Sequence, residues 1–380
     1  MRDLFYFGDV NFLRITILTN GPGELWGWVR PVTAELRKRG HSISLWILPC
    51  QFASGHEREA GSLLGVDKLE GPSSASRIWR DITQEKTDRI IQLGGDIMFG
   101  LRMSKAAKVP LFCYTYGVKK EYEGVKILTA YKKQTNNIKS VMAIGDLTKD
   151  ALDMDVTPSG VYGWNWPKQE DSPRVLILPG SRPAIRHAVL DWVCEVHECL
   201  RARIPNIRVR ALFSQFMPES ELDQWQKAGL NPVRAGAGVA MREADFAFTQ
   251  PGTNNFEMMH CGLPGLVVAP EKFLKFVPVS GVFGMLANLP LIGLSLRKKA
   301  AMRIINKWGG VISLPNRIAS SKVLNEMYGD ITEEDAAEEI AEELRNPDKL
   351  AKTREELLKL SGESGAASRL CDIVTSGSVR

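Results

Sequence analysis

Short apolar runs alternate with helix-like stretches along most of this 380-residue chain, and that alternation restricts the possible folds more than any other feature. Runs such as LRITILT (13–19) and SISLWILP (42–49) are each followed by a stretch with helical periodicity. Apolar runs of this length, joined by helices, are typical of a parallel sheet buried on both faces. The sequence therefore predicts an α/β fold.

The alternation is interrupted once and then restarts. Residues 163–173, GWNWPKQEDSP, contain two prolines and a charged cluster, as an interdomain linker does. A new apolar run follows at 174–180, and GVISLPN (310–316) is expected to be the last strand. We therefore predict two doubly wound, Rossmann-like domains that face each other across a cleft. Their predicted extents are 1–165, completed by a C-terminal helix within 362–380, and 171–361.

LPGSRPAIRH (178–187) places a polar turn at the carboxyl end of the first strand of the second domain. Gly180 permits a close backbone approach to a ligand, Ser181 offers a hydroxyl donor, and Arg182 offers a planar fork that suits phosphate. The alternative is an ordinary strand-to-helix turn with a solvated arginine.

TQPGTNNFEMMHCG (249–262) is a second such turn, where a strand gives way to a helix near Thr253. The unpaired N–H groups of a helix start, here at Gly252 and Thr253, suit a diphosphate. Glu257 lies one turn further on the same face, where a carboxylate can accept hydrogen bonds from ribose hydroxyls. As alternatives, Asn254 or Asn255 caps the helix and Glu257 balances its dipole.

The first domain carries weaker signals. The glycines of NGPGELWGW (20–28) miss the GxGxxG spacing, and no acidic residue ends the second strand, so a dinucleotide cofactor is not expected. The six cysteines and five histidines show no metal-ligand spacing, so neither a metal nor another cofactor is predicted.

Three motifs are together recognisable: LPGSR, PGTNNFEMMHCGLPGLVV and SLPNRIA (313–319). In order and spacing, over about residues 14–377, they resemble the lipid A disaccharide synthase family of GT-B glycosyltransferases. The second motif is also similar to that of the lipid II-forming N-acetylglucosaminyltransferase, in which the helix glutamate holds the uridine ribose. The resemblance implies a GT-B enzyme that uses a UDP-sugar.

The resemblance also implies roles for particular residues. Asp96, in QLGGDIMFG, would be the base that deprotonates the acceptor hydroxyl, with helix capping as the alternative. Gly23 and Glu24 would belong to the acceptor turn, although the serine and aspartate that follow in the family are missing here. The donor side would be formed by Gly180, Ser181, Arg182, Gly252, Thr253, Asn254, Asn255, Glu257 and Asn316.

Charge is concentrated in one segment. Residues 272–308 carry seven basic and no acidic side chains, and 276–296 carry no charge at all. We expect a helical hairpin that lies on a membrane, with each basic residue contributing about 1 kcal/mol through anionic head groups. The alternative is a buried element with a basic edge. The N-terminus does not resemble a signal peptide, so the expected location is cytoplasmic, peripheral on the inner face of the cytoplasmic membrane.

The resulting hypothesis is an inverting, metal-independent transferase that moves an acylated glucosamine from a UDP-sugar to a membrane-borne acylated glucosamine 1-phosphate. Expected partners are the UDP-sugar, the acylated sugar lipid and the membrane surface, with a homodimer considered and no nucleic acid. The alternatives are a GT-B transferase with another lipid acceptor, a UDP-N-acetylglucosamine 2-epimerase, and a non-catalytic relative that binds nucleotide sugars.

Overall fold

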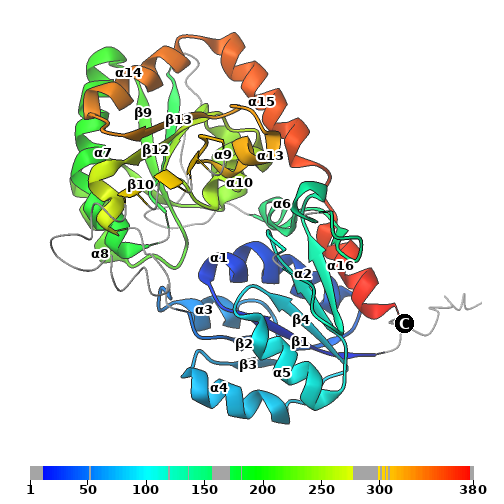
Figure 1. The fold of residues 1–380 in the computed structure, drawn as a ribbon. Helices are drawn as coiled ribbons and strands as arrows, with labels where there is room; N and C mark the ends of the chain where they lie inside the picture. The colour runs from blue at the N-terminus through cyan, green and yellow to red at the C-terminus, as the bar shows by residue number, and fades with distance from the viewer. Residues whose placement is uncertain are drawn as a thin grey trace, which may run out of the picture. The chain divides into compact units, whose positions relative to one another are not determined.

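A computed structural model describes residues 12–50, 53–118, 120–135, 137–155, 172–180, 182–276, 298–299, 302–303, 305–306 and 309–376. The chain forms two compact units (Figure 1). Unit 1 comprises Met1–Ala151 and Glu363–Arg380, and unit 2 comprises Leu152–Gly362. The predicted linker lies outside the described residues except for its last two positions.

Unit 1 is built on a seven-stranded parallel sheet with the order β3-β2-β1-β4-β5-β6-β7. The strand order reverses between β1 and β4, which makes the sheet doubly wound. The strands are β1 (Arg14–Thr19), β2 (Ser42–Ile47), β3 (Lys68–Glu70), β4 (Arg89–Leu93), β5 (Leu111–Tyr114), β6 (Val125–Thr129) and β7 (Met142–Ala143).

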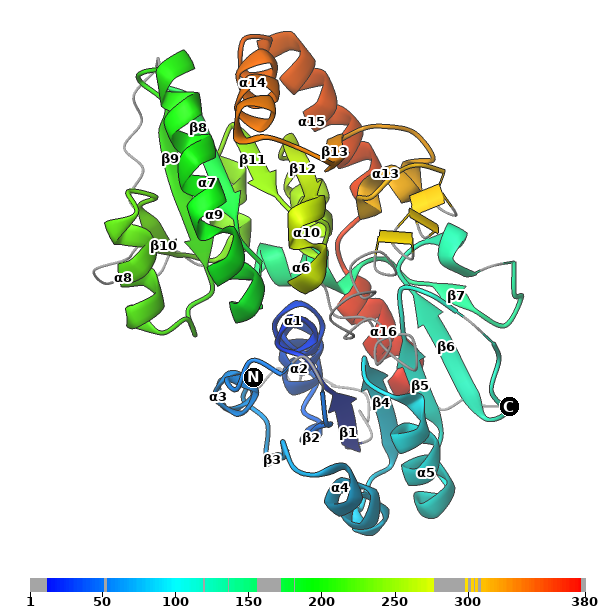
Figure 2. The ribbon, with the colours of Figure 1, turned by 60° about the vertical axis from the view of Figure 1, so that its left-hand side comes forward.

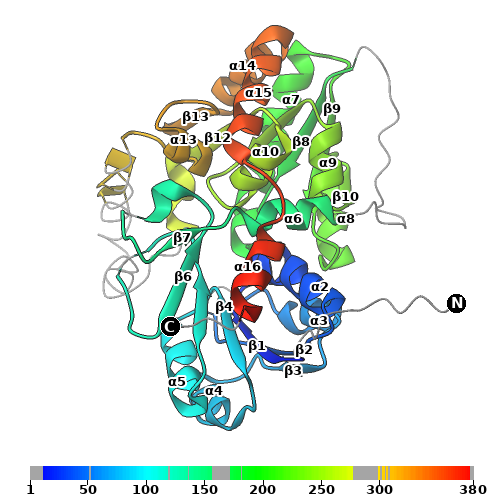
Figure 3. The ribbon, with the colours of Figure 1, turned by 90° about the vertical axis from the view of Figure 1, so that its right-hand side faces the viewer.

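Helices cover both faces of this sheet. α4 (Ala75–Asp81) and α5 (Ile97–Ala107) contribute Ile78 and Met103 to a core with β1, β2 and β4. The C-terminal helix α16 (Ala366–Thr375) lies beside α2 (Arg30–Lys38), as Figure 3 shows. The remaining helical pieces of unit 1 are α1 (Pro22–Glu24), a π-helical turn (Leu25–Val29), α3 (Glu57–Ser62), 3₁₀ turns (Ile82–Gln84 and Lys132–Thr135) and α6 (Leu147–Asp153), which runs into unit 2.

Unit 2 is built on a six-stranded parallel sheet with the order β10-β9-β8-β11-β12-β13. Its strand order reverses between β8 and β11. The strands are β8 (Arg174–Leu178), β9 (Arg208–Phe213), β10 (Pro232–Arg234), β11 (Phe246–Thr249), β12 (Gly265–Pro270) and β13 (Asn325–Gly329).

The main core of unit 2 lies between its sheet and three helices, α7 (Pro183–Arg203), α8 (Glu219–Lys227) and α14 (Glu333–Leu344), to which Trp192, Trp225 and Ile340 belong. Figure 2 shows α14 beside α7. The other helices are α9 (Ala237–Glu243), α10 (Asn254–Cys261), a 3₁₀ turn (Glu271–Phe276), α13 (Leu314–Ala319) and α15 (Pro347–Ser361).

The prediction of two doubly wound parallel α/β sheets is confirmed. The strand expected at 310–316 is wrong, because α13 begins at Leu314 and the last strand of the sheet is β13. Ser313 accepts a hydrogen bond from the amide of Asn316 as a helix cap, and Pro315 occupies the first turn, where it needs no N–H partner.

Candidate functional site

The two predicted turns of unit 2 follow β8 and β11, the strands between which the order reverses. Thr249 Oγ1, at the end of β11, donates to the carbonyl oxygen of Leu178, at the end of β8, at 3.1 Å. Gln250 Nε2 donates to the carbonyl oxygen of Pro179 at 2.9 Å. The two turns are therefore tied together at the point where doubly wound sheets usually bind ligands.

The backbone at position 180 has a φ of +85°, a left-handed conformation that favours glycine. A Cβ there would also lie 2.5 Å from Gln250 Nε2, so the Gln250 side chain would have to move. Arg182 is exposed and immediately precedes α7, whose first residue is Pro183. Ser181 lies outside the described residues.

A buried ion pair supports this turn. Arg186 is 2% exposed and donates from Nη1 to the carbonyl oxygen of Gly180 at 3.1 Å. Its Nε and Nη2 both donate to the carboxylate of Glu221, at 2.5 and 3.0 Å. The sequence analysis missed this pair. Arg186 stands one helical turn after Arg182, so its position in the sequence could have indicated a role beside this turn. Its partner Glu221 lies 35 residues away on α8, so no local pattern predicts the pair.

The start of α10 is shaped by Asn255, which is completely buried. Its Oδ1 accepts from the amide of Gly252 at 3.2 Å, and its Nδ2 donates to the carbonyl oxygen of Gln250 at 3.3 Å. The side chain of Asn255 therefore holds the turn from within the first turn of the helix. The N-cap residue is Thr253, so the alternative that Asn254 or Asn255 caps the helix is wrong. Thr253 precedes the helix without a side-chain cap, and both it and Gly252 are exposed.

Glu257 lies one turn below the tip of α10, since its amide donates to the carbonyl oxygen of Thr253 at 3.4 Å. Both Glu257 and Asn254 are half-buried. The spacing predicted between the helix tip and a carboxylate on the same helix is therefore present. The contact of Glu257 with a ribose stays a prediction.

Asn316 was expected to line a cleft, but its side chain is completely buried. Its Nδ2 donates to the carbonyl oxygen of Leu324 and to Glu326, at 2.8 and 2.7 Å. Its Oδ1 accepts from the amides of Val323 and Leu324. With these four bonds, Asn316 fixes the connection between α13 and β13, so in this structure its side chain is a structural group.

In unit 1 the corresponding reversal of strand order lies between β1 and β4, and the same type of bond joins them. Thr19 Oγ1 donates to the carbonyl oxygen of Leu93 at 2.8 Å. Gly94 and Gly95 follow, with φ of +89° and +78°. A Cβ on Gly94 would lie 2.9 Å from Cγ of Glu24, so this turn needs glycine to make room for the Glu24 side chain.

The surroundings of Glu24, which follows β1 at this edge, change its acidity. Its carboxylate folds back over Gly21, and burial raises the pKa of Glu24 above its ordinary value. Gly23 is exposed, with open space beside its Cα.

Asp96 caps α5. Its Oδ1 accepts from the amide of Met98 at 3.0 Å, and the residue is exposed. The capping alternative is therefore present in the structure. A cap uses one carboxylate oxygen, so it does not by itself prevent the second from accepting a proton, and the role of Asp96 as a base stays a prediction.

The sequence analysis also missed a buried carboxylate, Asp146, which is 1% exposed and follows β7. Tyr116 and Tyr131, which follow β5 and β6, donate from their hydroxyls to Asp146 at 2.7 and 3.2 Å. Burial first, and then Asp146, raises the pKa of Tyr116 and of Tyr131. Trp28 stacks edge-on against Tyr116, with ring centroids 4.9 Å apart. In the sequence, this cluster is indicated by a polar side chain shortly after each of three successive strands, β5, β6 and β7.

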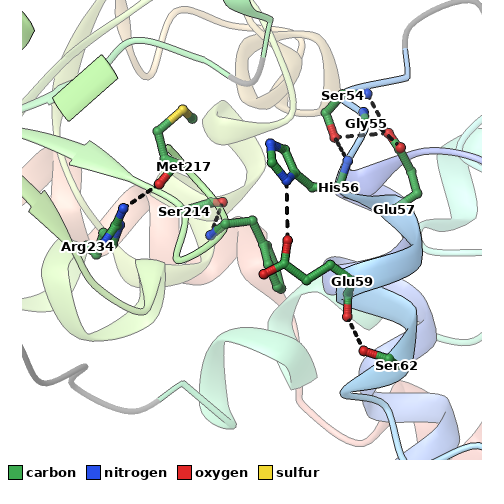
Figure 4. A network of polar contacts seen from close by, with 10 residues as sticks. Ser54, Gly55, His56, Glu57, Glu59, Ser62, Ser214, Met217 and Arg234 are labelled. Carbon is green, nitrogen blue, oxygen red and sulfur yellow. Dashed lines mark hydrogen bonds and ion pairs between the residues drawn. The ribbon is translucent and has the colours of Figure 1, made fainter. Parts of the chain in front are cut away.

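Figure 4 shows how loops at the carboxyl edges of both sheets are held within each unit. In unit 1, the amides of Ser54 and Gly55 donate to the buried carboxylate of Glu57 at the start of α3. In unit 2, Arg234 donates to the carbonyl oxygen of Met217, in the loop after β9. These loops are thus shaped by side chains that bind backbone.

The predicted membrane segment, 272–308, lies largely outside the described residues. Of its basic residues, Lys272 pairs with Glu333 at 2.5 Å and stands 5.5 Å above the ring of Trp192, and Lys298 pairs with Glu271 at 2.8 Å. Within the described ranges, no helix has both the length and the apolar character needed to cross a bilayer. Membrane contact stays a prediction.

Comparison with known proteins identifies the fold. No protein-family model and no curated protein matches the chain. MurG of Acinetobacter baumannii is 14% identical, with a TM-score of 0.55 over 95% of this chain and 99% of that one. A calicheamicin glycosyltransferase is 12% identical, with a TM-score of 0.52 over 97% of this chain and 99% of that one. A UDP-N-acetylglucosamine 2-epimerase is 11% identical, with a TM-score of 0.56 over 95% of each chain. The predicted GT-B fold is confirmed.

Proposed function

We propose that the protein is an inverting glycosyltransferase that moves an acylated glucosamine from a UDP-sugar to a membrane-borne acylated glucosamine 1-phosphate. One observation carries the proposal: the tip of α10 and the Gly180 turn are tied together where the strand order of unit 2 reverses, with Glu257 one helical turn away. A helix start provides amides and a positive dipole end for a diphosphate. Likeness in fold to a glycosyltransferase and to a UDP-N-acetylglucosamine 2-epimerase supports a nucleotide-sugar substrate.

In the proposed reaction, Asp96 accepts the proton of the acceptor hydroxyl while the hydroxyl oxygen forms a bond to the anomeric carbon of the donor. The bond from that carbon to the diphosphate oxygen breaks, and UDP leaves with the electron pair. The amides at Thr253 and Asn254, together with Arg182, stabilise the charge that develops on the leaving diphosphate. Attack from the side opposite to UDP inverts the configuration.

The test is a mass-spectrometric assay of the purified full chain with UDP-2,3-diacylglucosamine and 2,3-diacylglucosamine 1-phosphate. We expect the disaccharide 1-phosphate and free UDP in equal amounts. Absence of both products would contradict the proposal. If UDP-N-acetylglucosamine is instead epimerised at C2, as seen by proton NMR, the protein belongs with the epimerases that share its fold.

Glu257→Ala tests the donor site directly. Loss of charged hydrogen bonds worth about 1.5–3 kcal/mol should weaken UDP binding by about 10- to 150-fold in calorimetry. Glu243→Ala, an exposed glutamate at the end of α9, is the matched control and should bind UDP as the wild type does. Unchanged affinity in Glu257→Ala would remove the ribose assignment.

A further inference from the structure

The helical stretch that follows β1 is irregular just after the turn that carries Gly23 and Glu24. In the π-helical turn, the amide of Arg30 donates to the carbonyl oxygen of Leu25, five residues earlier instead of four. Pro31 comes next and has no N–H to donate to the residue four positions earlier. Backbone hydrogen bonds therefore hold the start of this stretch less firmly than they hold the rest of α2.

Trp28 is the side chain that ties this irregular turn to the other strand ends of unit 1. Its Nε1 donates to Thr148 Oγ1 at 3.2 Å and to the hydroxyl oxygen of Tyr116 at 3.4 Å. Its ring stands edge-on against the rings of Tyr114 and Tyr116, with centroids 5.1 and 4.9 Å away. Trp28 lies four residues after Glu24 in the same helical stretch, so a shift of Trp28 would move Glu24.

The buried carboxylate of Asp146 fixes both hydrogen-bond partners of Trp28. Asp146 Oδ1 accepts from the hydroxyl of Tyr116 at 2.7 Å and from the amide of Thr148 at 3.0 Å. The hydroxyls of Tyr116 and Thr148 are 2.8 Å apart and share a hydrogen bond. An apolar cluster can stabilise a fold as well as a buried charge does, whereas hydrogen bonds also fix direction.

Ordinary structural roles account for only part of this network. Asp146 immediately precedes α6 and accepts from the amide of Thr148, as a helix cap does. Tyr131 joins the end of β6 to the same carboxylate. Neither role needs the hydroxyl of Tyr116 or its link to Trp28. The network also lies at the carboxyl edge of the sheet, where doubly wound sheets bind ligands.

We propose that Tyr116 and Asp146 are positioning residues, which hold the turn of Gly23 and Glu24 in place for the acceptor by fixing Trp28. The inference rests on the proposed function, in which this turn belongs to the acceptor side. Neither residue needs to touch the acceptor, because each acts through Trp28.

Steady-state kinetics of the full chain with two isosteric variants test the proposal. Tyr116→Phe keeps the ring beside Trp28 and removes the hydroxyl. Its kcat/KM for the acceptor should fall about 10- to 100-fold, since a misplacement of about 1 Å can cause such a loss. The KM for the UDP-sugar and the affinity for UDP should stay as in the wild type.

Tyr131→Phe is the matched control, because it removes a hydroxyl that binds the other oxygen of the same carboxylate, Oδ2. It should leave kcat/KM for the acceptor unchanged, and melting temperatures check that both variants fold. A purely structural network would give both variants the same kinetics. Equal losses in the two variants, or wild-type kinetics in Tyr116→Phe, would therefore overturn the proposal.

Hydrogen exchange followed by mass spectrometry tests the link to Trp28 without any transfer reaction. The amides of residues 23–29 should exchange faster in Tyr116→Phe than in the wild type or in Tyr131→Phe. If this difference is seen but the wild type makes no disaccharide, the positioning of the turn is supported and the proposed reaction is wrong. If exchange is the same in both variants, the positioning role is overturned, whether or not the wild type transfers the sugar.

Discussion

Asp96 and Glu24 follow neighbouring strands of one sheet but stand in different surroundings, and residue-level experiments can separate them. Asp96 is an exposed helix cap, whereas Glu24 is packed against Gly94. Asparagine also caps helices well, so Asp96→Asn should keep the fold. If Asp96 is the base, this variant should lose about 10²- to 10⁴-fold in transfer rate with UDP affinity unchanged, as followed by UDP release and calorimetry. Wild-type turnover in Asp96→Asn, with a loss in Glu24→Gln, would assign the proton to Glu24.

The raised pKa of Glu24 predicts a dependence of stability on pH. A carboxyl whose pKa is higher in the folded than in the unfolded state binds more protons when folded, so it lowers the free energy of unfolding as pH rises. The ordinary pKa of Glu24 is 4.5, so the loss of stability caused by its buried carboxylate is absent below that pH. The loss is complete at a pH above the raised pKa that Glu24 has in the folded state. Glu24→Gln should therefore raise the melting temperature at pH 8 and leave it unchanged at pH 4. An equal shift at both values would contradict the buried, destabilised carboxylate.

At the scale of elements, the Arg186–Glu221 pair links α7 to α8 and supports the Gly180 turn. Removing one partner of a buried pair leaves an uncompensated charge, so Arg186→Met should cost about 3–5 kcal/mol in the free energy of unfolding. In the double variant Arg186→Met, Glu221→Met, both charges are gone, and most of that loss should be recovered. Urea denaturation measures both, and a double variant less stable than the single one would contradict this account.

Local patterns predicted most elements and some of the turns. β1, β8 and the tip of α10 were recognisable because apolar runs, glycines and polar turn residues stand next to one another in the sequence. The start of α13 was misread because Ile312 and Ser313 resemble the end of a strand, although the Ser-Leu-Pro sequence is a helix start. The roles of Asn316, Arg186 and Asp146 depend on partners elsewhere in the fold, which no local pattern shows.

At the scale of the whole molecule, the prediction to test is contact with a membrane through 272–308. Lys299 and Arg303 are exposed, and neutralising both should remove about 2 kcal/mol of attraction to anionic lipids, roughly a 30-fold loss of binding. The double variant with Lys299→Gln and Arg303→Gln should therefore co-sediment less with phosphatidylglycerol vesicles. The control is the double variant with Lys352→Gln and Lys359→Gln, which removes the same amount of charge from exposed positions of α15. It should bind the vesicles as the wild type does. Equal binding by both double variants would exclude this segment as the attachment site.

The position of α16 in unit 1 has a consequence for how the protein is made. Its residues pack on α2 and bind its end, where Arg39 donates to Asp372 and Ser368. Between the two stretches of unit 1 the ribosome must synthesise all of Leu152–Gly362, which takes about 10–40 s at 5–20 residues per second. Throughout that interval the apolar side of α2 that α16 will cover is exposed to chaperones, while the inserted unit has every residue it needs to fold first.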